Sequence, residues 1–235
     1  MNPIATQSPH PASAPQIKVC GLTREEDIQT CLSLGVNALG FVFYPKSPRH
    51  VSKNRARDLC REIGQRADAV GVFVNAEYRA IMERADFCGL TAVQLHGQEP
   101  PDLVRKLLDR GLRVIKALFA HGEPGLNRLT DYYASASLVE CGRGRLPGGN
   151  ALTWNWSEAR PIGRHAPLIL AGGLAPENVA QAIESAMPAA VDVSSGVEEA
   201  PGIKDPLKLK PFVRAVSSCM ASIPTDSRRI FHATS

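Results

Sequence analysis

Short apolar runs alternate with longer amphipathic segments along almost the whole chain. Runs such as LGFVF, VGVFV and LILA are apolar at every position, which is typical of parallel strands that are covered on both faces. Strands that alternate with helical segments predict βα units around a parallel sheet. We expect eight such units, with strands at Ile17–Cys20, Ala38–Phe43, Ala69–Val74, Thr91–Leu95, Val114–Leu118, Ser137–Glu140, Leu168–Ala171 and Ala190–Val193.

The segments between the runs carry helix start signals. Thr23 and Glu26 have the spacing of a capping box, and Gly35 marks the end of the helix that follows them. Pro101, in the pair Pro100–Pro101, begins a second helix, and Pro176 is placed in the first turn of another. These signals support the alternation of strands and helices.

Eight βα units in 235 residues fit the lower size limit of a (β/α)8 barrel. A doubly wound open sheet is the alternative, but no G-x-G-x-x-G motif follows the first strand to support a dinucleotide-binding version. We therefore expect an α/β fold with a single (β/α)8 TIM barrel over residues 16–221. Residues 1–15, rich in Pro, Ala and Ser, predict a disordered leader, and residues 222–235 a flexible C-terminal tail.

Composition narrows the classes of partner. The chain has 44% hydrophobic and 21% charged residues, which fits a globular domain. Lys and Arg number 27 against 23 Asp and Glu, without a basic run, so the pattern favours small anionic ligands over nucleic acid. The first residues resemble neither a secretory signal nor a membrane anchor.

The six cysteines are scattered and form no C-x-x-C pair, so they indicate neither a zinc site nor a disulfide framework. This usage is typical of a reducing compartment, and we expect a cytoplasmic protein that is a monomer rather than a homodimer.

Barrel enzymes place their active sites at the C-terminal ends of the strands. Cys20 ends the first strand, where a thiol is a functional candidate, although a free cysteine is also a common buried apolar residue. Arg49 follows the second strand in YPKSPRHVS. It is either part of a solvated basic turn or a clamp for a carboxylate.

The fourth strand ends in VQLHG, where Gln94 and His96 share one face. Their side chains can point into the barrel mouth and bind substrate, or His96 can be a hydrogen-bonded structural residue. The histidines show no H-x-H or H-E-x-x-H spacing, which disfavours metal catalysis.

The last two strands end in glycine- and serine-rich turns. Gly172 and Gly173 allow a ligand to approach the backbone closely, and Ser194, Ser195 and Gly196 supply further amide donors. Barrels often bind phosphate between these two loops. The pair of loops therefore predicts a phosphate site.

The motifs KVCGLT, GFVFYPKSPRHVS, VGVFVN, AVQLHG, VIKA, AGGLAPENV and VDVSSGVE occur in this order between Ile17 and Phe212. Their order resembles the phosphoribosylanthranilate isomerase family of tryptophan biosynthesis. The resemblance implies a barrel without cofactor or metal that converts an aminoaldose into an aminoketose by an Amadori rearrangement. It also implies that Cys20 is the base, that Arg49 holds the anthranilate carboxylate, that Asp192 orients the substrate, and that the loops around Gly173 and Ser195 hold phosphate.

The chain departs from the family pattern at the end of the sixth strand. Glu140 stands where the family has the aspartate that acts as general acid, and the loop GRGRLPGGNALTWNW replaces the usual Gly-Gly-Ser/Thr-Gly-Lys. The extra methylene displaces the carboxyl by about 1 Å, an offset that can cost about a hundredfold in rate. Two alternatives follow: a barrel that acts on another phosphorylated aminosugar, and a protein that binds a phosphate ligand without turnover.

Overall fold

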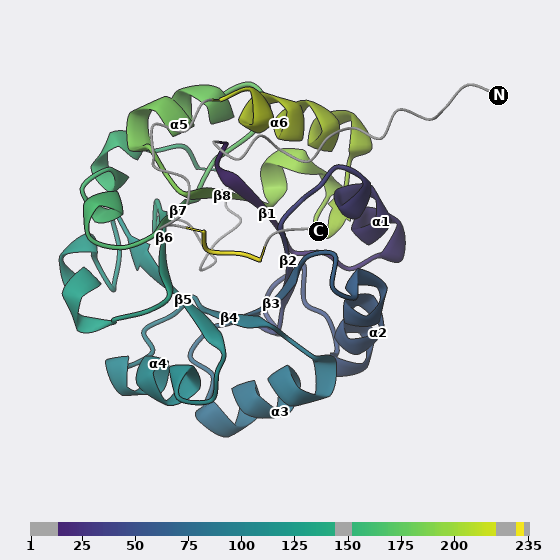
Figure 1. Cartoon of the computed structure of the whole chain (residues 1–235), viewed down its shortest axis with the longest axis vertical. Coiled ribbons are helices and arrows are strands. Elements are labelled where there is room, and N and C mark those ends of the chain that lie inside the picture. Colours follow the sequence, from purple (N-terminus) through teal and green to yellow (C-terminus); the bar gives the residue numbers. More distant parts are fainter. Residues whose placement is uncertain (1–13, 144–151, 220–228, 233–235) are drawn as a thin grey trace.

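The computed structural model describes residues 14–143, 152–219 and 229–232. Eight parallel strands close into a barrel in chain order, and Figure 1 shows the helices as a ring around it. The predicted (β/α)8 fold is confirmed, and each observed strand end lies within one residue of its predicted position. The strands are β1 (Gln16–Cys20), β2 (Ala38–Val42), β3 (Asp68–Phe73), β4 (Ala92–Leu95), β5 (Arg113–Phe119), β6 (Ala136–Glu140), β7 (Leu168–Leu170) and β8 (Ala190–Val193).

Six α-helices cover the barrel in the described part of the chain: α1 (Glu25–Ser33), α2 (Lys53–Ile63), α3 (Tyr78–Cys88), α4 (Pro101–Leu108), α5 (Val179–Ala186) and α6 (Pro206–Ser218). The connections after β5 and β6 contain the 3-10 helices η1 (Leu126–Asp131), η2 (Trp156–Ala159) and η3 (Ile162–Arg164) instead of predicted α-helices. Pro161 and Gly163 interrupt the second connection, which explains why only short 3-10 turns form there.

Two of the predicted helix starts are wrong. Helix α1 begins at Glu25 without a side-chain cap, because its N-cap position is Arg24 rather than Thr23, whose hydroxyl donates to the carbonyl of Gly202 at 2.7 Å. Helix α5 begins at Val179, so Pro176 lies in the preceding turn. The local sequence pattern assigns Thr23 and Pro176 to helix starts, but Thr23 forms a tertiary contact and Pro176 lies in a turn.

Successive side chains along each strand point to opposite faces of the barrel, so the apolar core has two parts. Residues that face outward pack under the helices, and those that face inward form a separate cluster inside the barrel. On β1, Ile17 and Val19 belong to the outer core, whereas Gln16, Lys18 and Cys20 face inward. Beyond β8 the chain forms the 3-10 helix η4 (Ser195–Val197) and an antiparallel pair, β9 (Glu198–Ala200) and β10 (Ile203–Lys204).

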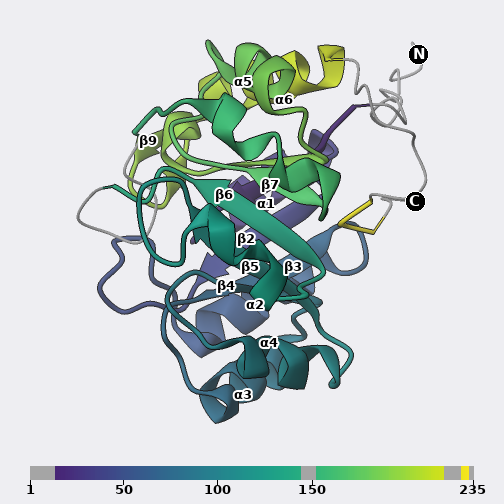
Figure 2. The same ribbon diagram turned by 90° about the vertical axis from the view of Figure 1, so that its left-hand side faces the viewer.

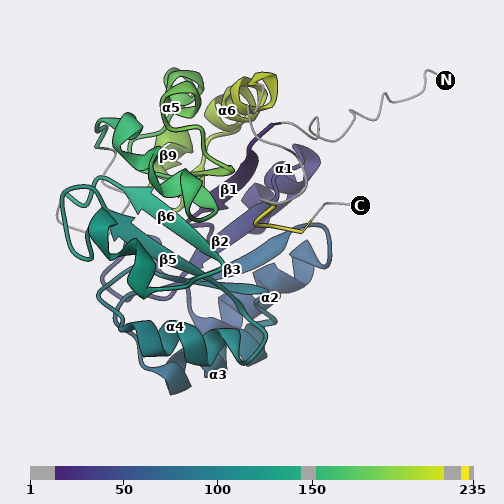
Figure 3. The same ribbon diagram turned by 60° about the vertical axis from the view of Figure 1, so that its left-hand side comes forward.

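Residues 229–232 lie across the N-terminal end of the barrel. The sequence assigns them to a flexible tail, whereas Ile230 and Phe231 are buried in the inner cluster. The Gln16 amide accepts from the backbone of both residues, at 2.8 and 3.0 Å, and donates to the Phe231 carbonyl at 2.9 Å. Figures 2 and 3 show this segment at the end of the barrel opposite to β9. The predicted domain boundary at residue 15 lies close to residues 1–13, which the structure does not describe. The predicted boundary at residue 221 lies within residues 220–228, which are also outside the described part.

Candidate active site

Four polar side chains point inward where the strands end: Cys20 on β1, Glu140 on β6, Asp192 on β8, and His96 directly after β4. Parallel strands end at one rim of the barrel, so these groups meet although they are far apart in sequence. Cys20, His96 and Glu140 are buried, and Asp192 is partly buried. The rim therefore combines a thiol, an imidazole and two carboxyl groups in a site that is largely shielded from water.

Lys18 lies one inward-facing position below Cys20 and pairs in register with Asp192 of the neighbouring strand. Its ammonium group contacts the Asp192 carboxylate at 2.8 Å, and Lys18 is fully buried. This lysine was not predicted from the sequence. A charged residue within an apolar strand, two positions from a candidate cysteine, is the signal that could have identified it.

Arg49 is held by the carboxylate of Glu198, which was also not predicted from the sequence. The Glu198 oxygens accept from Nε of Arg49 at 2.9 Å and from Nη2 at 2.6 Å, and Lys204 Nζ donates to Glu198 at 2.8 Å. Burial works against the charge on Glu198, but Arg49 and Lys204 outweigh it and lower the Glu198 pKa. One carboxylate between two cations leaves a surplus positive charge, and no described residue accepts from Nη1 of Arg49.

Glu140 is joined to the two residues predicted from VQLHG. His96 Nε2 lies 3.2 Å from a Glu140 carboxyl oxygen, and its Nδ1 lies 2.8 Å from the Gln94 amide nitrogen. The direction of both hydrogen bonds depends on the histidine tautomer, which the orientation of the Gln94 amide sets. Gln94 is only 1% exposed and lies beneath His96. Its position suits orientation of the imidazole better than direct contact with substrate.

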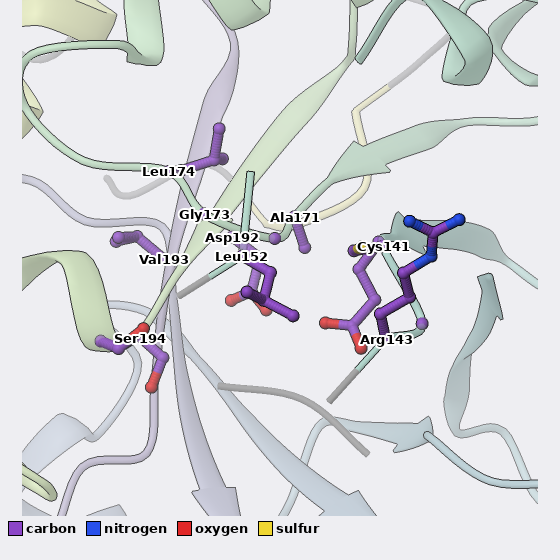
Figure 4. A pocket seen from close by; sticks show the side chains of 13 residues that line it. Cys141, Arg143, Leu152, Ala171, Gly173, Leu174, Asp192, Val193 and Ser194 are labelled. Carbon is purple, nitrogen blue, oxygen red and sulfur yellow. The ribbon is translucent and has the colours of Figure 1, made fainter. Parts of the chain in front are cut away.

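The loops predicted to bind phosphate border one pocket. Figure 4 shows Cys141 and Arg143 on one side of it and Gly173 and Ser194 on the other. Within the described ranges, no hydrogen bond occupies the backbone N–H of Gly173 or of Ser195. Gly173 has a φ of +69°, so both its conformation and its free amide suit close contact with an anion.

Gly173 and Gly196 lie so close to neighbouring backbone atoms that neither position has room for a side chain. A Cβ on Gly173 would lie 2.6 Å from the Thr153 nitrogen, and a Cβ on Gly196 only 1.9 Å from the Leu174 carbonyl oxygen. The Trp154 indole donates to the carbonyl of Ala171 at 3.0 Å. Glycine is therefore required where the β7 and β8 loops meet, and the end of the β6 loop passes over them.

The pocket unites most of the predicted residues. The residues of this set that line the pocket are Glu140, Gly172, Gly173, Asp192, Ser194 and Ser195, whereas its lining does not include Cys20, Arg49, Gln94, His96 and Gly196. Cys20 is connected to the pocket through the Ser194 hydroxyl, which donates to the Cys20 carbonyl at 3.0 Å. In the β6 loop, Gly148, Gly149, Asn150 and Ala151 lie outside the described residues.

Among the described helices, none is both long and apolar enough to cross a membrane. The cysteines in this part of the chain are unpaired.

Comparison with known proteins gives consistent matches. The family model described as N-(5'phosphoribosyl)anthranilate (PRA) isomerase matches residues 17–215. The N-(5'-phosphoribosyl)anthranilate isomerase of Desulfatibacillum aliphaticivorans is 49% identical over 92% of this chain and 98% of its own length.

Two solved structures match with a TM-score of 0.77 and 40% sequence identity, each over 86% of this chain and 98% of its own. One holds mutually generated monomers of the dimeric phosphoribosylanthranilate isomerase of Thermotoga maritima. The other is a phosphoribosyl anthranilate isomerase in complex with reduced 1-(o-carboxyphenylamino)-1-deoxyribulose 5-phosphate.

Proposed function

The chain belongs to the N-(5'-phosphoribosyl)anthranilate isomerase family, and from this premise we propose which residues carry out the reaction. The enzyme converts N-(5-phosphoribosyl)anthranilate into 1-(2-carboxyphenylamino)-1-deoxyribulose 5-phosphate in L-tryptophan biosynthesis. The observation that carries the assignment is the pocket in which Glu140 and Asp192 face the β7 and β8 loops, with the Lys18–Asp192 ion pair two residues from Cys20 along β1.

Glu140 is the general acid and Cys20 the base. Protonation of the ribose ring oxygen by Glu140 opens the ring and leaves an imine at C1 of the sugar. The Cys20 thiolate then removes the proton from C2, which the imine acidifies, and the resulting enol amine tautomerises to the ketone. The hydrogen lost from C2 is balanced by one gained at C1, so the reaction needs no external oxidant or reductant.

The remaining polar groups hold the two ends of the substrate. Arg49, oriented by Glu198, presents its free edge to the anthranilate carboxylate, and Asp192 accepts from a sugar hydroxyl. The amides around Gly173 and Ser195 bind the phosphate. His96 contacts Glu140 and is positioned by Gln94, so it can hold the acid in place while also facing substrate.

The direct test follows the fluorescence of freshly made phosphoribosylanthranilate after addition of the protein. Catalytic loss of the signal supports the isomerase. Binding of this ligand without its loss would favour the alternative of a phosphate-ligand-binding protein. Turnover of a different phosphorylated aminosugar, with phosphoribosylanthranilate inert, would favour the diverged enzyme.

Arg49→Ala is expected to raise KM by about ten- to a hundredfold, since a hydrogen bond to a charged group contributes about 1.5–3 kcal/mol. The value of kcat should change much less, because the carboxylate lies away from the reacting carbons. Steady-state kinetics measure both constants, and Arg57→Ala on the exposed side of α2 is the control. An unchanged KM for Arg49→Ala removes Arg49 from the binding site.

A crystal structure obtained in sulfate is expected to show the anion bound by the backbone amides of Gly173 and Ser195. These amides converge on one pocket and have no partner within the described residues. Crystals grown in chloride provide the control. Sulfate bound elsewhere on the barrel mouth, with this pocket empty, would contradict the assignment.

We also propose a cytoplasmic monomer with one domain over residues 16–221, to which residues 229–232 add contacts at the N-terminal end of the barrel. The unpaired cysteines of the described residues support a reducing compartment. The related structures include a dimeric enzyme and monomers made from it. Sedimentation of the full chain distinguishes a monomer from a dimer.

A further inference from the structure

Lys18 is a buried charge that the reaction described above does not use. It is fully buried on β1, its ammonium group lies 2.8 Å from Asp192, and its charge acts on the Cys20 thiol two residues along the strand. A Cβ on Gly40 of the neighbouring strand would lie 2.9 Å from Cys20 Sγ and 3.2 Å from Lys18 Nζ. The missing side chain at Gly40 therefore provides the space in which thiol and ammonium approach each other.

The positive charge of Lys18 interacts with both the Asp192 carboxylate and the Cys20 thiol. Burial disfavours the ammonium form of Lys18, but Asp192 and Cys20 outweigh it and raise the Lys18 pKa, so the lysine stays charged. Burial raises the pKa of Cys20, and Lys18 is the strongest influence that opposes this rise. Asp192 acts on the thiol in the opposite direction, because its negative charge competes for the same lysine.

We propose that Lys18 is a positioning residue that divides its charge between Asp192 and the Cys20 thiolate and thereby maintains Cys20 as a base. The proposal rests on the role of Cys20 in the proposed function. A buried thiolate without a counter-charge would be costly in this environment, and Lys18 is the cation on its own strand.

Other charged groups face Cys20 but are already engaged. Lys204 Nζ donates to the Cys20 carbonyl at 2.7 Å rather than to its sulfur, and it also contacts Glu198. Arg49 is bound to the same Glu198. On β2 and β3 the thiol meets Val42 and Val72, with Tyr44 packed against them. His96 and Glu140 act on the pKa of Asp192.

This arrangement couples base strength to substrate binding. A sugar hydroxyl that donates to Asp192 disperses part of its negative charge, and Lys18 then interacts more strongly with the thiolate. The base is thus strengthened when substrate occupies the pocket, while the unoccupied enzyme retains a less reactive thiol.

The test compares Asp192→Asn with the double variant Lys18→Met/Asp192→Asn. The two proteins differ only in the lysine, and neither contains an unpaired Asp192 charge. The pH dependence of iodoacetamide alkylation at Cys20 is measured on the full chain without substrate by mass spectrometry of the Cys20 peptide. This reports the thiolate directly and does not depend on turnover.

Relative to wild type, Asp192→Asn should raise alkylation of Cys20 at neutral pH by about tenfold, equivalent to about one pKa unit. The double variant should alkylate about tenfold or more slowly than Asp192→Asn, with its midpoint moved to higher pH. Equal pH profiles for the two variants would overturn the proposal, because Lys18 would then have only a structural role.

Lys116→Met/Glu99→Gln is the matched control. Lys116 is also fully buried and ion-paired, at 2.9 Å from Glu99, but it faces the outer core, since its neighbours on β5, Ile115 and Ala117, belong to the inner cluster. This variant should lower Tm and leave Cys20 alkylation unchanged, and a similar shift in it would also overturn the proposal. A failure of the thiol test leaves the isomerase activity itself intact, whereas loss of the proposed function would appear in the fluorescence assay.

Discussion

Cys20→Ser is expected to lower kcat by about a thousandfold while the barrel remains folded. General base catalysis contributes about 10²–10⁴ in rate, and a serine hydroxyl at the same position does not ionise appreciably near neutral pH. The substitution exchanges sulfur for oxygen in a site with little free space, so the packing against Val42 and Val72 is retained. Single-turnover measurements with saturating substrate isolate the chemical step.

Cys31→Ala is the matched control for this result. Cys31 is fully buried on α1, and burial raises its pKa to about 12, so it holds no thiolate at neutral pH. Its loss should cost stability and leave kcat nearly unchanged. Activity of Cys20→Ser within tenfold of wild type would show that Cys20 serves packing alone, and thermal unfolding of both variants separates this outcome from misfolding.

Glu140→Gln is expected to lower kcat by about a hundredfold or more. The amide preserves the shape of the side chain and its contact with His96 but has no proton to transfer to the ring oxygen. Glu123→Gln, on the exposed loop after β5, is the control and should behave like wild type. Wild-type rates in Glu140→Gln would assign the proton transfer to another group.

Glu140→Asp examines the geometry of the same group. Shortening the side chain withdraws the carboxyl by about 1 Å from His96 and from the pocket, and we expect a loss of kcat of the order of a hundredfold. A gain in activity would mean that the substrate lies where the family's usual aspartate would reach it. The pH profile of kcat identifies whether the acid still acts in the shortened variant.

The sequence predicts the barrel well because each strand is specified locally. Runs such as LGFVF are apolar throughout and have no alternative to burial on both faces, and β8 begins and ends at its predicted residues. Thr23 shows where this reasoning stops. Its spacing to Glu26 fits a capping box, but the Gly202 carbonyl, distant in sequence, takes its hydroxyl.

In the candidate site, too, some residues could be predicted from the sequence, whereas contacts between residues distant in sequence could not. Cys20 could be selected because strand ends in a barrel converge on one rim, whereas Glu140 and Asp192 were selected from the resemblance to the family. The partners of Arg49 could not be predicted by the same rule. Glu198 and Lys204 lie in the short antiparallel pair after β8, and only the closed fold brings them beneath the arginine.

The C-terminal segment has a consequence for how the barrel unfolds. Residues 229–232 bond to Gln16 of β1, to Asp68 of β3 through the His232 amide at 2.8 Å, and to Arg113 of β5 at 3.0 Å. These three strands are not neighbours in the ring. Opening the barrel at any one of them breaks contacts made by the same short segment. Fraying of β1 at the start of the fold is therefore linked to fraying of β5 in its middle. The segment makes the two halves of the barrel a single cooperative unit, in which local opening near one strand is opposed by contacts to the others.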